Sequence, residues 1–155
     1  MTPAAAEMLD PALFANVMKP PLEAESLPAW CYTDPDFHRL EIERLFMKVW
    51  NFVGRDDLMP DAGDYLATDV AGIPIILIRG GDGIARAFAN SCRHRGTQLL
   101  TGEGNCKAIV CPYRGWAFDL SGALVSVAEM DETVGFDKDD HALKPLRLES
   151  WAGFL

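Results

Sequence analysis

The sequence lacks any long apolar segment. No run of apolar residues approaches the roughly 20 that span a bilayer, and residues 1–20 have neither the basic start nor the apolar centre of a signal peptide. Basic residues are also few, since Lys and Arg total 14 against 23 Asp and Glu, a net charge of -9. This charge argues against phosphate backbones and anionic membranes as main partners. We therefore expect a cytoplasmic protein that binds neither membranes nor nucleic acids.

Cysteine is scarce as well, with four residues in a chain of 155. Because no export signal precedes them, the thiols are expected to stay reduced and available to metals rather than to form disulfides. The length is about that of one domain, which can bury on the order of two thirds of its unfolded surface. A hydrophobic core alone can therefore hold the fold together.

The first part of the chain is predicted to be an arm followed by one helix. Residues 1–28 mix alanine-rich pieces with five prolines, which limits any helix there to one or two turns. Asp34 can then cap a helix that has Pro35 at its first position. Apolar residues recur at helical spacing after this cap, so one amphipathic helix is predicted over about 35–48.

From about residue 49 the pattern changes to short β-rich runs separated by glycines. Gly80, Gly81 and Gly83 indicate a tight hairpin with positive φ angles, and Ser121 and Gly122 indicate another. These signals predict a mainly β, antiparallel fold. The predicted strands lie within residues 64–70, 73–79, 85–91, 107–111, 123–127 and 146–155.

One group of residues has metal-ligand character. Cys92 and His94 flank a single residue, and Cys111 opens a second turn after sixteen intervening residues. Two such loops brought tip to tip would gather sulfur and imidazole donors, which suits an iron–sulfur cluster or zinc. The alternative is that each cysteine is simply a buried core residue, since a pattern this short is weak on its own.

The surrounding sequence favours the metal site. "NSCRHRG" followed by "GNCKAIVCPYRGWAFDLSGAL" resembles the Rieske domain of the large (alpha) subunit of ring-hydroxylating oxygenases, which oxidise aromatic compounds and some other small molecules. The resemblance extends over roughly residues 27–155. It implies an antiparallel Rieske-type two-sheet sandwich over 29–155 with cluster-loop hairpins, after the arm of residues 1–28.

The resemblance also implies a 2Fe-2S cluster and its ligands. Cys92 and Cys111 would hold the inner iron and His94 the outer iron, with Trp116 shielding the cluster from water. The family's fourth ligand is a histidine, and Arg114 stands at the matching position. A guanidinium offers hydrogen-bond donors but no lone pair near neutral pH, so the second ligand of the outer iron is expected to be missing.

No other residue is expected to replace that ligand. Cys106 precedes Cys111 by five residues on the expected strand, so alternation directs it to the opposite face. His38 falls on the predicted helix and His141 on a late loop, and both are predicted to be surface residues.

The oxygenase family performs its chemistry at a mononuclear iron held by two histidines and a carboxylate in a following domain. The three histidines of this chain include no closely spaced pair, so the catalytic domain is expected to be absent. The resemblance therefore implies an electron-transfer domain that serves such an iron and receives electrons from a ferredoxin or reductase. It also implies a homo-oligomer of large subunits. Two alternatives stay open: a cluster-free fold acting as a binding or assembly module, and zinc on Cys92, His94, Cys111 and water.

Overall fold

The computed structural model describes residues 2–127, 130 and 133–155 and divides into two compact units, Met1–Asn51 and Phe52–Leu155. Throughout the described part, no helix is both long and apolar enough to cross a membrane. All four cysteines are free thiols.

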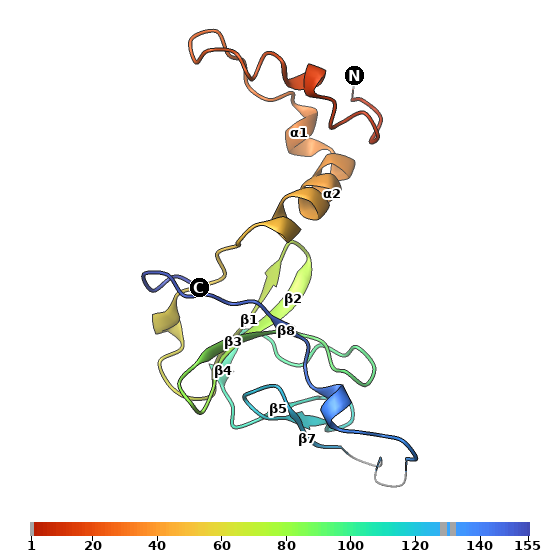
Figure 1. Ribbon diagram of the computed structural model, residues 1–155, viewed down its shortest axis with the longest axis vertical. Coiled ribbons are helices and arrows are strands. Elements are labelled where there is room, and N and C mark those ends of the chain that lie inside the picture. Colours follow the sequence, from red (N-terminus) through yellow and green to blue (C-terminus); the bar gives the residue numbers. More distant parts are fainter. Residues whose placement is uncertain (1, 128–129, 131–132) are drawn as a thin grey trace. The chain divides into compact units, whose positions relative to one another are not determined.

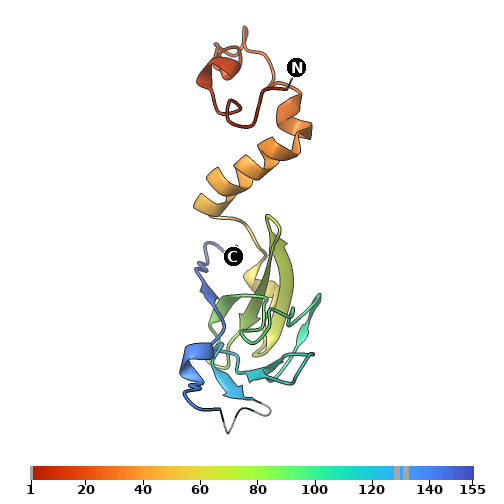
Figure 2. The ribbon, with the colours of Figure 1, turned by 90° about the vertical axis from the view of Figure 1, so that its right-hand side faces the viewer.

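The first unit is helical, and its main helix is visible in Figure 2. The carboxylate of Asp34 accepts hydrogen bonds from the backbone N–H groups of Asp36 and Phe37, at 2.8 and 3.3 Å, so the predicted cap is confirmed. The helix ends at Arg44 rather than at residue 48, because Leu45 adopts φ −117° and the chain continues as a 3₁₀ turn. The elements are η1 Pro11–Phe14, α1 Trp30–Thr33, α2 Pro35–Arg44 and η2 Phe46–Lys48.

The second unit contains two antiparallel sheets (Figure 1), which confirms the predicted fold class. The larger sheet has the order β4-β1-β2-β3-β8 and the smaller one β5-β6-β7. The strands are β1 Asp64–Val70, β2 Ile73–Arg79, β3 Ala85–Ala89, β4 Glu103–Asn105, β5 Ile109–Val110, β6 Ala117–Phe118, β7 Leu124–Ser126 and β8 Pro145–Leu146, with 3₁₀ turns η3 Asp56–Leu58 and η4 Asp139–His141.

Two of the predicted strands are much shorter than expected. The run 107–111 keeps only β5, and the run 146–155 keeps only the end of β8. Near the end of the chain, Ala152 and Gly153 have φ angles of 50° and 82°, which turn the backbone so that Trp151 pairs with Phe154. A continuous strand is therefore not possible there.

Strand β2 is buried on both faces and separates two hydrophobic clusters. Ile76 and Ile78 belong to the main core, which also contains Phe118 of the smaller sheet. Ile75 and Leu77 belong to a second cluster on the other face. The main core joins the two sheets and comprises Ile76, Ile78, Phe88, Cys92, Leu99, Ile109, Cys111, Trp116, Phe118, Leu124, Val127 and Leu143.

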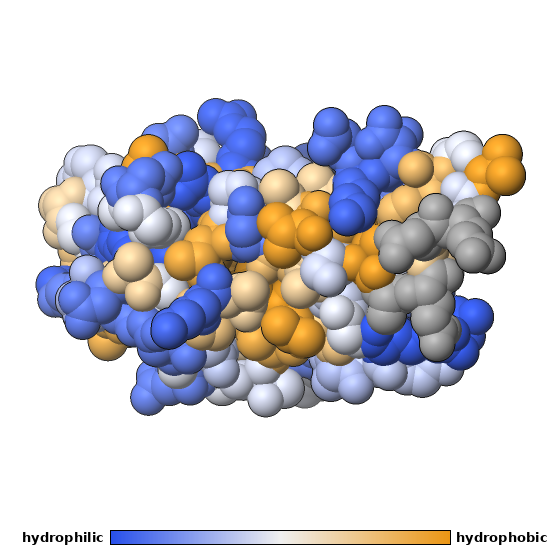
Figure 3. Space-filling view, turned by 90° about the horizontal axis from the view of Figure 1, so that it is seen from below, coloured by the Kyte–Doolittle hydropathy of each residue, from blue (hydrophilic) through white to orange (hydrophobic). Residues whose placement is uncertain are grey.

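Apolar side chains remain exposed on the smaller sheet. Val110 of β5 and Val125 of β7 are each about half exposed. Figure 3 views the protein from the side on which β5 and β7 lie in Figure 1, and it shows hydrophobic surface in the middle of this face, flanked by hydrophilic side chains. The buried face of the sheet thus carries the core while its outer face stays apolar.

The hairpin between β2 and β3 forms where it was predicted, but its glycines differ in backbone conformation. Gly83 has φ 78°, whereas Gly80 and Gly81 do not adopt positive φ angles, so that part of the prediction is wrong. At Gly80 a Cβ atom would come within 3 Å of Nη1 of Arg86 and Oδ1 of Asp82, so a larger residue there would displace the ends of these two side chains.

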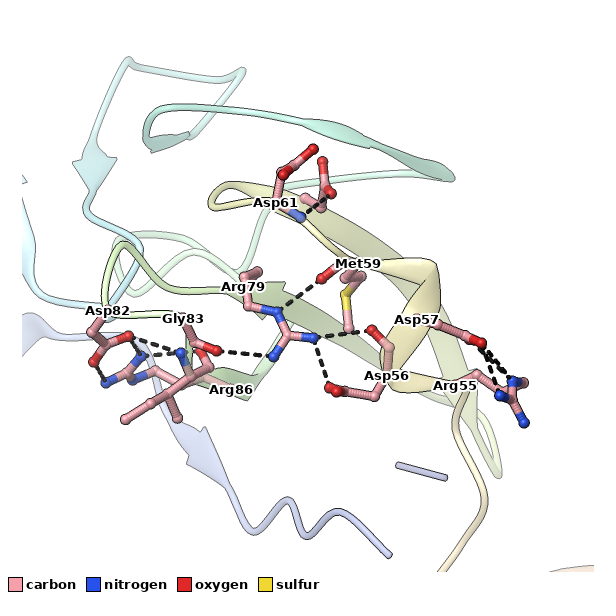
Figure 4. Close-up of polar contacts among 11 residues, drawn as sticks. Arg55, Asp56, Asp57, Met59, Asp61, Arg79, Asp82, Gly83 and Arg86 are labelled. Atoms are coloured by element: carbon pink, nitrogen blue, oxygen red, sulfur yellow. Dashed lines mark hydrogen bonds and ion pairs between the residues drawn. The ribbon is translucent and has the colours of Figure 1, made fainter. Parts of the chain in front are cut away.

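Arg79 links the end of β2 to both neighbouring turns (Figure 4). Its Nε donates to the carbonyl of Met59 at 2.8 Å, and its Nη2 donates to the Asp56 carbonyl at 3.0 Å and to the Asp56 carboxylate at 2.6 Å. Its Nη1 donates to the carbonyl of Gly83 at 3.0 Å. One largely buried guanidinium thus fixes η3 and the β2–β3 hairpin together.

Asn90 performs a similar role beside the cysteine turns. It follows β3 and is 1% exposed. Its Oδ1 accepts hydrogen bonds from the N–H groups of Leu99 and Leu100, at 2.9 and 3.1 Å, and its Nδ2 donates to the Leu100 carbonyl at 2.7 Å. The segment that follows the first cysteine turn is therefore anchored to the end of β3.

We expect Asn90→Ala to lower the free energy of unfolding by about 2–4 kcal/mol, because it strands buried backbone groups that each cost about 1–3 kcal/mol when unsatisfied. Urea unfolding of the two proteins measures the difference. Gln98→Ala is the matched control, since the exposed Gln98 amide donates to the same Leu100 carbonyl at 3.3 Å. We expect that control to lose less than about 0.5 kcal/mol; equal losses would contradict the role given to Asn90.

Candidate functional site

The first cysteine turn is closed by two backbone hydrogen bonds. The N–H of Cys92 donates to the carbonyl of Thr97 at 2.8 Å, and the N–H of Gly96 donates to the carbonyl of Cys92 at 2.9 Å. Gly96 has φ 73°, a conformation that glycine adopts without strain. His94 therefore sits in the middle of a turn whose two ends are fixed.

The second cysteine turn has the same construction. Cys111 donates its N–H to the carbonyl of Trp116 at 2.8 Å, and Gly115, with φ 70°, donates to the carbonyl of Cys111 at 3.0 Å. The two turns therefore match in length, in hydrogen bonds and in the position of their glycine. The expectation of two comparable loops on hairpins agrees with this geometry.

The two cysteines meet in the core. Cys92 and Cys111 are each 3% exposed and belong to the same hydrophobic cluster. Burial raises the pKa of the Cys92 thiol, and the neighbouring Cys111 raises it further, while backbone N–H groups of His94 and Arg95 act in the opposite direction. Metal ligation requires the thiolate, so a bound cation would offset the cost of burying it.

His94 lies flat against Trp116. The ring centroids are 4.8 Å apart and the planes differ by 9°. Trp116 is only 2% exposed, so the indole forms a rigid apolar wall beside the imidazole. Such contacts restrict the orientation of a ligand and exclude water from it.

His141 also approaches this wall, and the prediction that it is a surface residue is wrong. Its ring lies 5.8 Å from Trp116 and 4.6 Å from Phe136, and its Nδ1 is 2.7 Å from the carbonyl of Asp137. It is half-buried. The cause is η4, which lies beside the smaller sheet in both Figures 1 and 2. Nothing local in the sequence signals this long-range approach.

Cys106 and His38 both lie outside the two cysteine turns. Cys106 lies before β5, so the strand-alternation argument does not apply to it; it is half-buried, and burial raises the pKa of its thiol. His38 is exposed on α2 in the first unit, as predicted. Among the residues that the structure describes, no three His, Cys, Asp or Glu side chains lie close enough to hold a single ion.

Arg114 is directed to an aromatic ring on the surface of its turn. Its Cζ lies 5.7 Å from the ring centroid of Tyr113, within cation–π range. Arg95, three residues after its cysteine just as Arg114 is, lies 6.0 Å from the same ring. Both arginines are exposed, as is Arg93. The cysteine turns are therefore positively charged at their surface although the chain as a whole is acidic.

Comparison with known proteins identifies relatives over most of the chain. Residues 49–146 match the family described as Rieske [2Fe-2S] domain. The carnitine monooxygenase oxygenase subunit of Escherichia coli (strain K12) is 42% identical over 141 residues, which cover 90% of this chain and 38% of that protein. The glycine betaine monooxygenase oxygenase subunit of Chromohalobacter salexigens is 40% identical over 131 residues, which cover 84% and 29%.

Solved structures give the same result. The quaternary ammonium Rieske monooxygenase CntA in complex with L-carnitine matches with a TM-score of 0.80 and 38% identity, over 84% of this chain and 38% of that one. Naphthalene 1,2-dioxygenase from Rhodococcus sp. bound to indole matches with a TM-score of 0.78 and 34% identity, over 83% and 30%. The chain thus spans less than two fifths of the length of each of these relatives.

The residues present fit most, but not all, of such a cluster. A Rieske cluster takes two cysteines on one iron and two histidines on the other. The turns supply the two cysteines, already together in the core, and one histidine, His94. Arg114 has no lone pair to offer. Three ligand positions are therefore matched and the fourth is not.

The ligand assignment can be tested in an Arg114→His background, which supplies the missing imidazole. We expect Cys92→Ser or Cys111→Ser to reduce iron and acid-labile sulfide per chain by more than about tenfold after anaerobic reconstitution, because each removes a thiolate ligand. Cys106→Ser is the matched control and should retain both. Equal losses in all three variants would contradict the assignment, and zinc bound without sulfide would favour a zinc site.

Proposed function

Because the chain belongs to the Rieske [2Fe-2S] domain family, we propose that it is the electron-transfer part of a Rieske oxygenase large subunit. The cofactor of this family is a 2Fe-2S cluster, which performs one-electron chemistry. The observation that carries the proposal is the pair of matching turns that brings Cys92 and Cys111 together in the core. Cys92, Cys111 and His94 are the proposed protein ligands.

The relatives also suggest a substrate class for the complete subunit. Carnitine, glycine betaine and choline, which name the relatives from Escherichia coli, Chromohalobacter salexigens and Beta vulgaris, are all quaternary ammonium compounds. We therefore propose that the subunit oxidises a quaternary ammonium compound, in preference to the aromatic compounds that the ring-hydroxylating resemblance suggests. The mononuclear iron for that reaction would lie outside these residues.

A ferredoxin or reductase is the proposed electron donor, and a homo-oligomer of large subunits is the proposed assembly. The exposed arginines of the cysteine turns support a donor with an acidic contact surface, because opposite charges steer association. Arg93, Arg95 and Arg114 are the residues that such a surface would meet.

A second candidate is a cluster-free module that keeps the fold for binding or assembly. The observation that favours it is Arg114, which replaces a ligand without disturbing the turn around it. Colour separates the two candidates, since a Rieske cluster absorbs visible light and a cluster-free fold does not.

A chimeric enzyme tests the electron-transfer role. This chain, carrying Arg114→His, would replace the matching segment of the Escherichia coli carnitine monooxygenase oxygenase subunit. We expect carnitine-dependent oxygen consumption, driven by that enzyme's own electron donor, at least about tenfold above the same chimera with Cys92→Ser. A chimera with an intact cluster spectrum but no activity would contradict the role, and a colourless one would favour the cluster-free module.

A further inference from the structure

Three exposed aromatic side chains form a patch on the second unit. Phe52, Trp151 and Phe154 are 67, 78 and 43% exposed, although all three are large and apolar. We propose that this aromatic patch is the contact surface for the catalytic domain of the complete large subunit. The inference rests on the proposed function in one respect, because it takes the chain to be part of such a subunit.

Phe154 is the centre of the aromatic patch. Its ring centroid lies 5.7 Å from that of Phe52 and 6.4 Å from that of Trp151. The Cζ atom of Arg55 lies 5.5 Å from the same centroid. Hydrogen bonds of 3.0, 3.2 and 2.8 Å to the carboxylate of Asp57 hold this guanidinium in place (Figure 4). The three rings are therefore one continuous surface that includes a cation.

The backbone that carries the aromatic patch is fixed by hydrogen bonds. Trp151 and Phe154 exchange two hydrogen bonds of 2.9 Å between their N–H and carbonyl groups, across a two-residue turn. Three more, of 2.9 to 3.0 Å, join residues 53–56 to residues 153–155, and Leu155 belongs to the second hydrophobic cluster. Because the rings are attached to an ordered backbone, little conformational entropy is lost when a partner covers them.

The size of the aromatic patch decides between a separate partner and a tethered one. A Phe or Trp side chain can bury about 150–250 Å², so the exposed parts of these three amount to on the order of 400 Å². A stable interface between separate proteins covers about 800 Å² on each partner. The patch alone is thus too small to hold a second copy of the chain. A domain of the same polypeptide needs less area, because tethering gives it a high effective concentration.

Two further observations support a domain of the same subunit as the partner. The matched segment makes up 38% of the Escherichia coli relative, so most of that protein lies outside the match. Aromatic side chains and arginine are enriched at protein interfaces, where Trp, Tyr and Arg contribute most of the binding energy. The aromatic patch, with Arg55 over its central ring, has this composition.

Hydroxyl-radical footprinting measures the exposure of each ring. The 155-residue chain with Arg114→His is compared with the chimera that joins it to the Escherichia coli carnitine monooxygenase oxygenase subunit and carries the same substitution. We expect oxidation of Phe52, Trp151 and Phe154 to fall by about fivefold or more in the chimera, because interface centres exclude water. Tyr113, 54% exposed on the second cysteine turn, is the internal control and should change by less than about twofold.

Two variants of the chimera test whether the aromatic patch itself makes the contact. Trp151→Ala removes the most exposed ring, and oxidation of Phe52 should then rise by about threefold or more. Ile84→Ala is the matched control, since Ile84 is 56% exposed on the β2–β3 hairpin, and it should leave Phe52 protected. In the 155-residue chain, both substitutions should shift the urea midpoint by less than about 0.3 M, which shows that the fold is intact.

The outcomes separate the inference from the proposed function. Unchanged oxidation of the three rings in a folded chimera would overturn the inference, while carnitine-dependent activity of that chimera would leave the function standing. Protection in a chimera that transfers no electrons would support the inference although the function fails. Rings already protected in the 155-residue chain would also overturn the inference. Sedimentation velocity would then assign the cover to a second copy if the chain is a dimer, and to its own helical unit if it is a monomer.

Discussion

The burial of two sulfur atoms in the core that joins the sheets is the constraint on which the rest of this unit depends. Cys92 and Cys111 are members of the same hydrophobic cluster as Ile76 and Phe118, so the site and the packing are built from shared residues. Arg114 is exposed and contributes nothing to that cluster. A ligand on the exposed side of the turn can therefore be replaced without a cost in packing, which explains how an intact scaffold and an incomplete donor set occur together.

Backbone hydrogen bonds define the shape of both turns. Each turn is closed by a bond from its cysteine and a bond back to that cysteine, and Asn90 anchors the segment after the first turn. These contacts are made by backbone groups and by the Asn90 side chain, and none of them uses the side chain at position 114. Preorganisation of this kind lowers the conformational cost of ligand binding, because the donors need not be ordered at the moment of association.

The sequence was sufficient for the fold class, the helix cap at Asp34 and the first three strands, because these depend on local periodicity and on turn residues. It was not sufficient for the length of the last strand, where two positive φ angles near Ala152 turn the chain. His141 was missed for a different reason. Its approach to Trp116 depends on the packing of η4, and no local pattern encodes a contact across 25 positions.

The placement of Cys92 and Cys111 in one buried cluster has a consequence for the protein when no metal is bound. Removing two electrons and two protons from this pair would join the sulfurs covalently, and air is a sufficient oxidant. The attacking species is the thiolate, which the raised pKa of Cys92 keeps scarce at neutral pH. Shelf life of the metal-free protein should therefore shorten as storage buffers become more alkaline, and a reductant should recover it.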